Sequence, residues 1–132
     1  MSSTGWTKTK REVTTLVRLW SKRMLLEAWH IEIEILSKLH GSTIGQINWV
    51  DGYKSATLQI SEVKWTASSD EFKSHTVVHE LRHLFQAPVT EILAKYVGYQ
   101  TLVWKAVNDE LEKVCDTDAK ILLQIYRRKR SG

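Results

Sequence analysis

The chain has 132 residues, of which 42% are hydrophobic and 26% are charged, and its formal net charge is +4. These values are typical of a globular protein and exclude a low-complexity or disordered chain, and the length predicts one domain over residues 1–132. No run of eighteen apolar residues occurs, and no apolar segment follows the first charges, so neither a membrane span nor a secretory signal is expected. The single cysteine, Cys115, excludes an internal disulfide and fits a reducing, cytoplasmic location.

Much of the excess positive charge lies near the two ends of the chain, at residues 8–11 and 127–130. Such clusters can contact nucleic acid or an acidic partner. They lack interleaved aromatic residues and a recognition helix, so solvated helix flanks and a basic tail are the favoured interpretation. Nucleic acid is therefore not expected as a partner, and nothing in the sequence fixes an oligomeric state.

The first half of the chain predicts one helix followed by three strands. Apolar residues recur at three- and four-residue spacing from Arg11 to about Glu27, which is the pattern of a helix with one buried face. The next segment, WHIEIEIL at residues 29–36, alternates apolar and polar side chains and predicts a half-buried strand. Residues 44–50 and 55–61 predict two more strands with a turn at residues 51–52, and we expect the three strands to be antiparallel.

The second half predicts mainly helices. Residues 62–74 are polar and mixed, which favours a loop with cap residues near its end. A helix should run from Ser74 or His75 to Gln86 and end there, because Pro88 lacks a backbone donor. Two further helices are expected, over residues 89–97 and over residues 102–126, the last one interrupted near Asn108.

The segment HTVVHELRHLF contains HELRH, which matches the pattern HExxH. Two histidines four residues apart lie on one face of a helix, so His79 and His83 can bind one tetrahedral zinc ion. Glu80 lies about a hundred degrees around the helix, where it can hold and deprotonate a water without binding the metal. The apolar residues of the same helix fall on the opposite side, which predicts one buried face: Val77, Val78, Leu81, Leu84 and Phe85.

A catalytic zinc ion needs a third protein ligand, and the candidates lie in the segment NDELEKVCD. Glu112 is the better candidate, because Asp116 follows one turn later and can orient Glu112 or accept an imidazole proton. Glu110 competes with it, and only one of the two can face the HELRH helix because they lie about two hundred degrees apart. The apolar residues of this helix do not decide between them.

Taken as a whole, the chain resembles the small zinc metallopeptidases of phage and prophage genomes. The resemblance is carried by the first helix, the W-x-I-x-I strand, the A-x-L-x-I strand, the segment TVVHELRHL and a later E-x-V-x-D. They are close to the minimal glutamate-type zincins called minigluzincins, over about residues 29–126. The resemblance implies an α+β, zincin-like fold with an N-terminal helix, a small three- to four-stranded and mostly antiparallel sheet, the HExxH helix and C-terminal helices. It also implies zinc held by His79, His83 and Glu112, with Glu80 as the general base.

The expected function is hydrolysis of peptide bonds in a peptide or protein substrate. A substrate strand could pair with an open sheet edge, for which the strand at residues 55–61 is the candidate. Arg82 departs from the resembled pattern and either is solvated or binds an acidic group. The oxyanion-stabilising residue is not ranked among Tyr96, Tyr99 and His75, and an exposed position is favoured for His75. The alternative function is a zinc-stabilised phage protein with little or no turnover that binds a host protein or nucleic acid.

Overall fold

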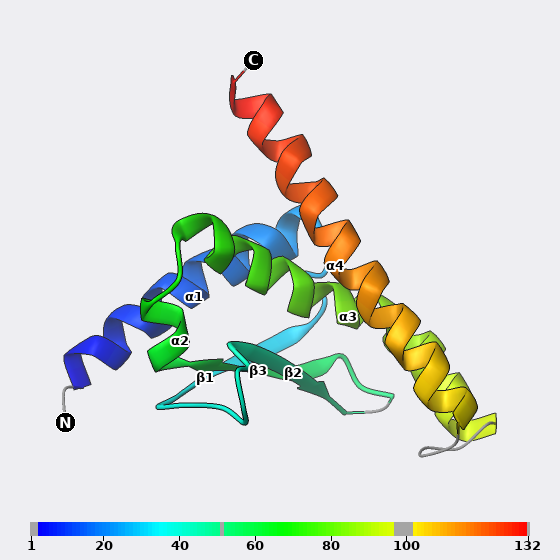
Figure 1. Cartoon of the computed structure of the whole chain (residues 1–132). Coiled ribbons are helices and arrows are strands. Elements are labelled where there is room, and N and C mark those ends of the chain that lie inside the picture. Colours follow the sequence, from blue (N-terminus) through cyan, green and yellow to red (C-terminus); the bar gives the residue numbers. More distant parts are fainter. Residues whose placement is uncertain (1–2, 51, 97–101, 132) are drawn as a thin grey trace.

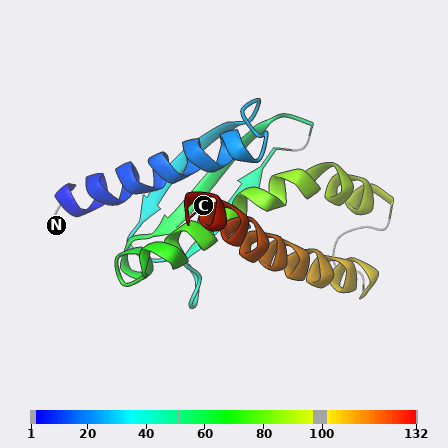
Figure 2. The same cartoon turned by 90° about the horizontal axis from the view of Figure 1, so that it is seen from above.

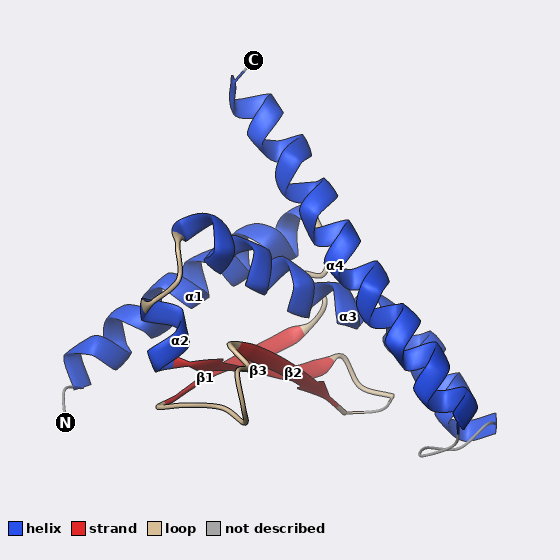
Figure 3. Ribbon diagram, in the orientation of Figure 1, coloured by secondary structure: helices blue, strands red, loops and turns tan. Residues whose placement is uncertain are grey.

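The computed structural model describes residues 3–50, 52–96 and 102–131, which form an α+β structure with a small mixed sheet (Figure 1). All of the longer helices lie on one side of the sheet (Figure 3). The elements in chain order are α1 (Ser3–Arg23), β1 (His30–Leu36), β2 (Gly45–Trp49), β3 (Ser55–Ser61), α2 (Glu62–Thr66), α3 (Asp70–Tyr96) and α4 (Leu102–Ser131). In the described part of the chain, no helix is long and apolar enough to cross a bilayer.

The sheet has the strand order β1-β3-β2, and its strands are not all antiparallel. The β2 and β3 strands form the expected antiparallel pair, with Gly52 in the turn between them at a φ of 81°. In contrast, β1 pairs with β3 in parallel, so the prediction of a mostly antiparallel sheet is wrong for half of its pairings. Alternating periodicity shows which face of a strand is buried, but it carries no information about the neighbour or the direction of that strand.

The prediction that β3 offers an open edge is also wrong, because β3 is the central strand. Its side chains facing the helices are fully covered, and Leu58 aligns with Ile33 of β1 and Ile47 of β2 across the sheet. On the other face, the Gln59 amide donates to Glu34 at 3.0 Å. Since β3 is hydrogen-bonded on both sides, the outer strands of the described sheet are β1 and β2.

The helix α3 packs close to the sheet because β2 begins with a glycine. A Cβ atom at Gly45 would lie 3.0 Å from the Cδ1 of Ile60 and 3.3 Å from the Cγ2 of Thr76, so only a residue without a side chain fits comfortably. Figure 2 shows α1 and α3 lying over the sheet, with α4 crossing α3 above them. Of the five residues predicted for the buried face of the HELRH helix, four are covered, with exposures of 0–2%: Val77, Val78, Leu81 and Leu84. The fifth, Phe85, is 45% exposed.

The bounds of several helices differ from the predictions. The first helix spans residues 3–23 rather than 11–27 and ends where Leu25 takes a left-handed conformation, with a φ of 59°. The helix α3 begins earlier than expected because the Oγ of Ser69 accepts from the backbone N–H of Phe72 at 3.1 Å and caps its first turn. The predicted loop contains the short helix α2, which is capped by Ser61 at the end of β3.

Proline 88 does not end the helix, and α3 continues to Tyr96. A proline removes one backbone hydrogen bond and its ring crowds the preceding turn, so the prediction expected a stop there. Pro88 is exposed, whereas Leu84 and Ala87 beside it are 1–2% exposed, so the packing of the buried side outweighs the lost bond. Likewise α4 passes through Asn108 without interruption, because an exposed asparagine costs a helix only part of a kcal/mol.

Candidate metal centre

Three histidines one turn apart lie along the α3 face that meets α4. His75, His79 and His83 are 15–19% exposed, and the ring centroids of His79 and His83 are 5.3 Å apart. The opposite face of α3 is anchored to the sheet by its apolar residues, so the histidine face is fixed relative to the core. The helix therefore has the two faces that the sequence predicts, one buried against the core and one that carries the histidines.

Glu112 of α4 lies against both predicted histidine ligands. Its Oε2 is 3.0 Å from the Nε2 of His79, and its Oε1 is 3.0 Å from the Nε2 of His83. Glu110 instead points away from α3, is 71% exposed and pairs with Lys113 at 3.0 Å. Of the two glutamates that the sequence left open, Glu112 is thus the one beside the imidazole pair.

The donor atoms of these three residues suit a zinc ion. Imidazole nitrogens and carboxylate oxygens bind zinc at about 2.0–2.2 Å, so neighbouring ligand atoms of a tetrahedral ion lie roughly 3.3 Å apart. The 3.0 Å separations between Glu112 and each Nε2 atom are close to that spacing. His79, Glu80 and His83 also form a group whose ligand atoms lie within 4.8 Å of one another, as expected of residues able to hold a metal ion.

The second nitrogen of each imidazole faces a neighbouring residue of α4. The Nδ1 of His79 is 3.8 Å from the Oδ1 of Asp116, and the Nδ1 of His83 is 3.6 Å from the Sγ of Cys115. The thiol of Cys115 in turn donates to the Oε1 of Gln86 at 3.3 Å. Burial raises the pKa of the Cys115 thiol to about 12, with a smaller contribution from the Glu112 charge, so the sulfur stays protonated.

From the sequence, neither Cys115 nor Gln86 was placed at the site, and the cysteine was used to exclude an internal disulfide. The available signal was its position three residues after Glu112, next to Asp116 on the same turn.

The imidazole of His83 is held toward its neutral form. Burial is the largest effect on His83 and lowers its imidazole pKa, although Glu112 acts in the opposite direction. The neutral imidazole that burial favours is the form that binds metals.

Asp116 contacts imidazoles rather than Glu112. Its Oδ1 lies 2.9 Å from the Nε2 of His75, and its Oδ2 lies 3.1 Å from the Nζ of Lys120. The hydrogen bond from Lys120 and, to a lesser extent, that from His75 lower the pKa of Asp116, so it is ionised at neutral pH. The expectation that His75 is exposed is wrong, because the contact with α4 leaves only 15% of its side chain exposed.

Glu80 is positioned next to the predicted ligands without being one of the closest contacts. Its side chain is 13% exposed, and its Oε2 lies 3.9 Å from the Nε2 of His79. Burial, and secondarily the charge of Glu112, raises the pKa of Glu80 to about 8, while a backbone hydrogen bond from Ile47 of β2 lowers it. A nearby cation would favour the ionised carboxylate, which is the form that can accept a proton.

Arg82 resolves the open question about its role by pairing with an acidic group of α4. Its Nε lies 2.5 Å from the Oδ2 of Asp118, a residue that the sequence analysis did not single out. The guanidinium carbon of Arg82 also lies 5.2 Å from the centre of the Phe85 ring. This ion pair connects α3 to α4 through the residue that directly precedes His83.

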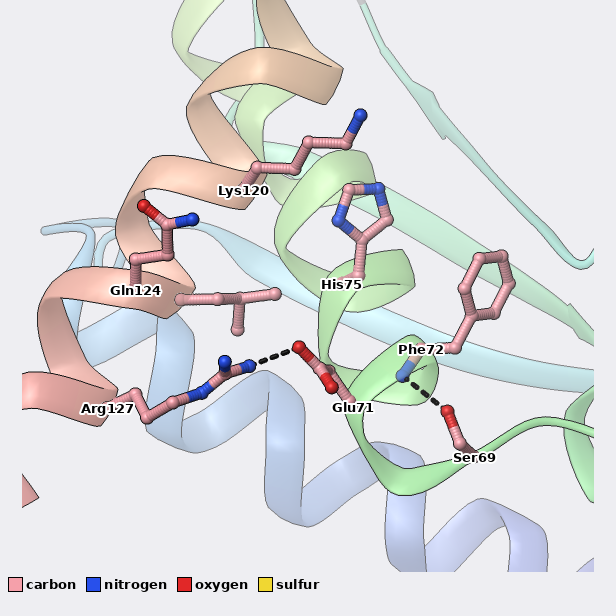
Figure 4. A pocket seen from close by; sticks show the side chains of 8 residues that line it. Ser69, Glu71, Phe72, His75, Lys120, Gln124 and Arg127 are labelled. Atoms are coloured by element: carbon pink, nitrogen blue, oxygen red, sulfur yellow. Dashed lines mark hydrogen bonds and ion pairs between the residues drawn. The ribbon is translucent and has the colours of Figure 1, made fainter.

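A pocket of about 350 Å³ lies beside the candidate metal centre, between the start of α3 and the C-terminal part of α4. Figure 4 shows His75 and Lys120 on its two sides, with Arg127 paired to Glu71 across its floor. The lining residues do not include His79, Glu80 or His83. His75 is thus the residue that separates this pocket from the candidate metal centre.

No family model, curated protein or solved structure matches the chain. The assignment of the site therefore depends on the chemistry and geometry of its own residues.

Proposed function

We propose that the protein is a zinc-dependent metallopeptidase with a zincin-like fold, acting on a peptide or protein. The observation that carries the proposal is the convergence of two imidazole Nε2 atoms on the two oxygens of Glu112, at 3.0 Å each. The carboxylate of Glu80, whose side chain is 13% exposed, lies 3.9 Å from the same nitrogen of His79. The zinc ligands would thus be His79, His83 and Glu112, and Glu80 would be the general base.

Each side chain would have a separate part in peptide hydrolysis. His79, His83 and Glu112 would hold zinc, which when bound lowers the pKa of a water and polarises a carbonyl group. Glu80 would accept the proton of the attacking water and pass it to the leaving amine. Asp116 and Cys115 would keep the imidazoles oriented through their Nδ1 atoms.

The outer strand β2 is the favoured place for a substrate strand to pair. It packs beside α3, and the backbone N–H of Ile47 reaches the carboxylate of Glu80. An extended peptide added to this edge would therefore pass close to Glu80. The earlier candidate, β3, cannot serve because both of its edges are occupied.

Zinc binding is tested by comparing two neighbouring glutamates of α4. The protein purified without chelators should contain one equivalent of zinc, and Glu112→Gln should lower the zinc affinity at least about 100-fold. Glu110→Gln is the matched control, since Glu110 is 71% exposed, and it should bind zinc like the wild type. Zinc well below one equivalent in the wild type, together with no change in melting temperature on adding zinc, would refute the proposal.

Turnover is tested with Glu80→Gln, which keeps the size of the side chain but removes the base. Peptide libraries digested by the zinc-loaded wild type and analysed by mass spectrometry should show new termini. The variant should lose this activity by a factor of about 100 or more while retaining its zinc. Equal activity of wild type and variant would remove Glu80 from the mechanism.

A metal-stabilised binding protein is the second candidate function. It is favoured by the position of His75, one of the three residues considered for stabilising an oxyanion, because its ring contacts Asp116. Tyr99 and the side chain of Tyr96 lie outside the described part of the chain. For such a protein, the Glu80→Gln variant should bind its host protein or nucleic acid partner as the wild type does, and no peptide should be cleaved.

A further inference from the structure

We infer that His75 is a positioning residue for the metal centre, which acts on the ligand His79 through Asp116. This inference rests on the proposed metal site but not on peptidase activity. Its basis is the order of contacts between α3 and α4: the Nε2 of His75 lies 2.9 Å from the Oδ1 of Asp116, and the same oxygen lies 3.8 Å from the Nδ1 of His79.

The direction of the hydrogen bond follows from the chemistry of the partners. An ionised carboxylate can only accept, so the Nε2 atom of His75 carries the proton and donates it to Asp116. A metal ligand that binds through Nε2 carries its own proton on Nδ1, and this N–H needs an acceptor. In His79 the Nδ1 atom faces the same Oδ1 that His75 holds, so His75 fixes the acceptor in place.

Burial distinguishes His75 from the other partner of Asp116. The His75 side chain is 15% exposed and is flanked by Phe72 and His79, whose ring centroids lie 6.0 and 6.2 Å from its own. Lys120 holds the other oxygen of Asp116, but its side chain is 66% exposed. Exposed ion pairs contribute little, whereas a covered hydrogen bond to a charged group restricts the carboxylate.

The test measures zinc affinity by competition with a chromophoric chelator at one pH. Asp116→Asn should weaken binding by about 10- to 100-fold, and His75→Leu by roughly three- to tenfold. His75→Gln should restore most of the loss because its amide N–H reaches about as far as Nε2, whereas His75→Asn is too short and should not. Lys113→Met removes an exposed lysine of the same helix that pairs with Glu110; it is the matched control and should change the affinity by less than about twofold.

If His75 acts on His79 only through Asp116, replacing His75 should have no effect on zinc affinity once Asp116 has been replaced. In the Asp116→Asn background, His75→Leu should cause no further loss of zinc affinity. An equal loss in both backgrounds, or no loss in either, would overturn the inference. If the leucine variant does not fold, as judged by circular dichroism, the glutamine and asparagine pair provides the same comparison.

Two readouts separate a positioning role from direct metal binding. The visible spectrum of the cobalt-substituted protein should be the same for the wild type and His75→Gln, because the ligand set is unchanged. A changed spectrum would instead make His75 a ligand. A second zinc equivalent in the wild type that is lost in His75→Gln would assign the group His75, His79 and Asp116 as a metal site of its own. Failure of the wild type to bind any zinc would refute the proposed function rather than this inference alone.

Discussion

Replacing Glu80 by glutamine should stabilise the metal-free protein, and the gain should grow with pH. In the folded chain the pKa of this carboxyl is raised from 4.5 to about 8, chiefly by burial. A carboxyl with a raised folded pKa contributes stability below pH 4.5, and this contribution is lost as the pH rises through 8. Glutamine keeps the shape and the acceptor oxygen of the side chain but carries no charge at any pH.

The magnitude follows from the two pKa values. One pKa unit corresponds to about 1.4 kcal/mol, so ionisation of Glu80 should cost the folded state about 1 kcal/mol at pH 5 and about 5 kcal/mol at pH 9. The stability difference between variant and wild type should therefore increase by about 4 kcal/mol over this range. Little discount for solvent screening is needed, because the side chain is 13% exposed.

Urea unfolding in the presence of a chelator, at pH 5, 7 and 9, measures this difference directly. The two proteins share all other ionisable groups, so to first order the contributions of these groups cancel in the comparison. A difference between variant and wild type that stays constant within error across the three pH values would refute the reasoning. It would mean that the carboxylate is solvated in the folded protein, and that burial does not control its charge.

Three further predictions concern the scaffold of the site. Leu25→Gly should raise the free energy of unfolding by about 1 kcal/mol, measured by urea titration, because Leu25 has a φ of 59° and is 85% exposed. Gly45→Val should lower it by roughly 1–3 kcal/mol and also weaken zinc binding, because the added atoms would push α3 away from β2; an unchanged stability would contradict the close approach. Cys115, whose thiol is buried and has a pKa of about 12, should react with iodoacetamide at pH 8 only after denaturation, which mass spectrometry of the folded and unfolded protein would check.

The sequence predicted the helices and strands with a clear hydrophobic periodicity better than it predicted how these elements pair with one another. The alternating strands β1 to β3 and the amphipathic helices were found, because each pattern reports which face of an element is buried. The parallel pairing of β1 with β3 was missed, because it depends on a contact between segments distant in the sequence. The helix α3 was cut at Pro88 because the local rule ignores the packing of Leu84 and Ala87, two buried residues in the turn before the proline.

For the site, the motif placed His79, Glu80 and His83 correctly on one helix, since their spacing fixes their directions. Sequence alone could not choose between Glu110 and Glu112, because the choice depends on how α4 is rotated against α3. The structure brings Glu112 to the histidines and leaves Glu110 with Lys113. The same rotation brings Cys115 to His83 and Asp118 to Arg82, two contacts that no periodicity could have predicted.

That rotation is the physical basis of the centre, because its ligands come from two helices held in different ways. The helix α3 is fixed by apolar residues buried against the sheet, whereas near the site α4 presents the small buried residues Cys115 and Ala119 to α3. Small residues allow the two helices to approach, and the ion pair between Arg82 and Asp118 connects them next to His83. A metal held by residues of both helices would therefore act as a third connection between them, so that its binding energy contributes to the stability of the fold.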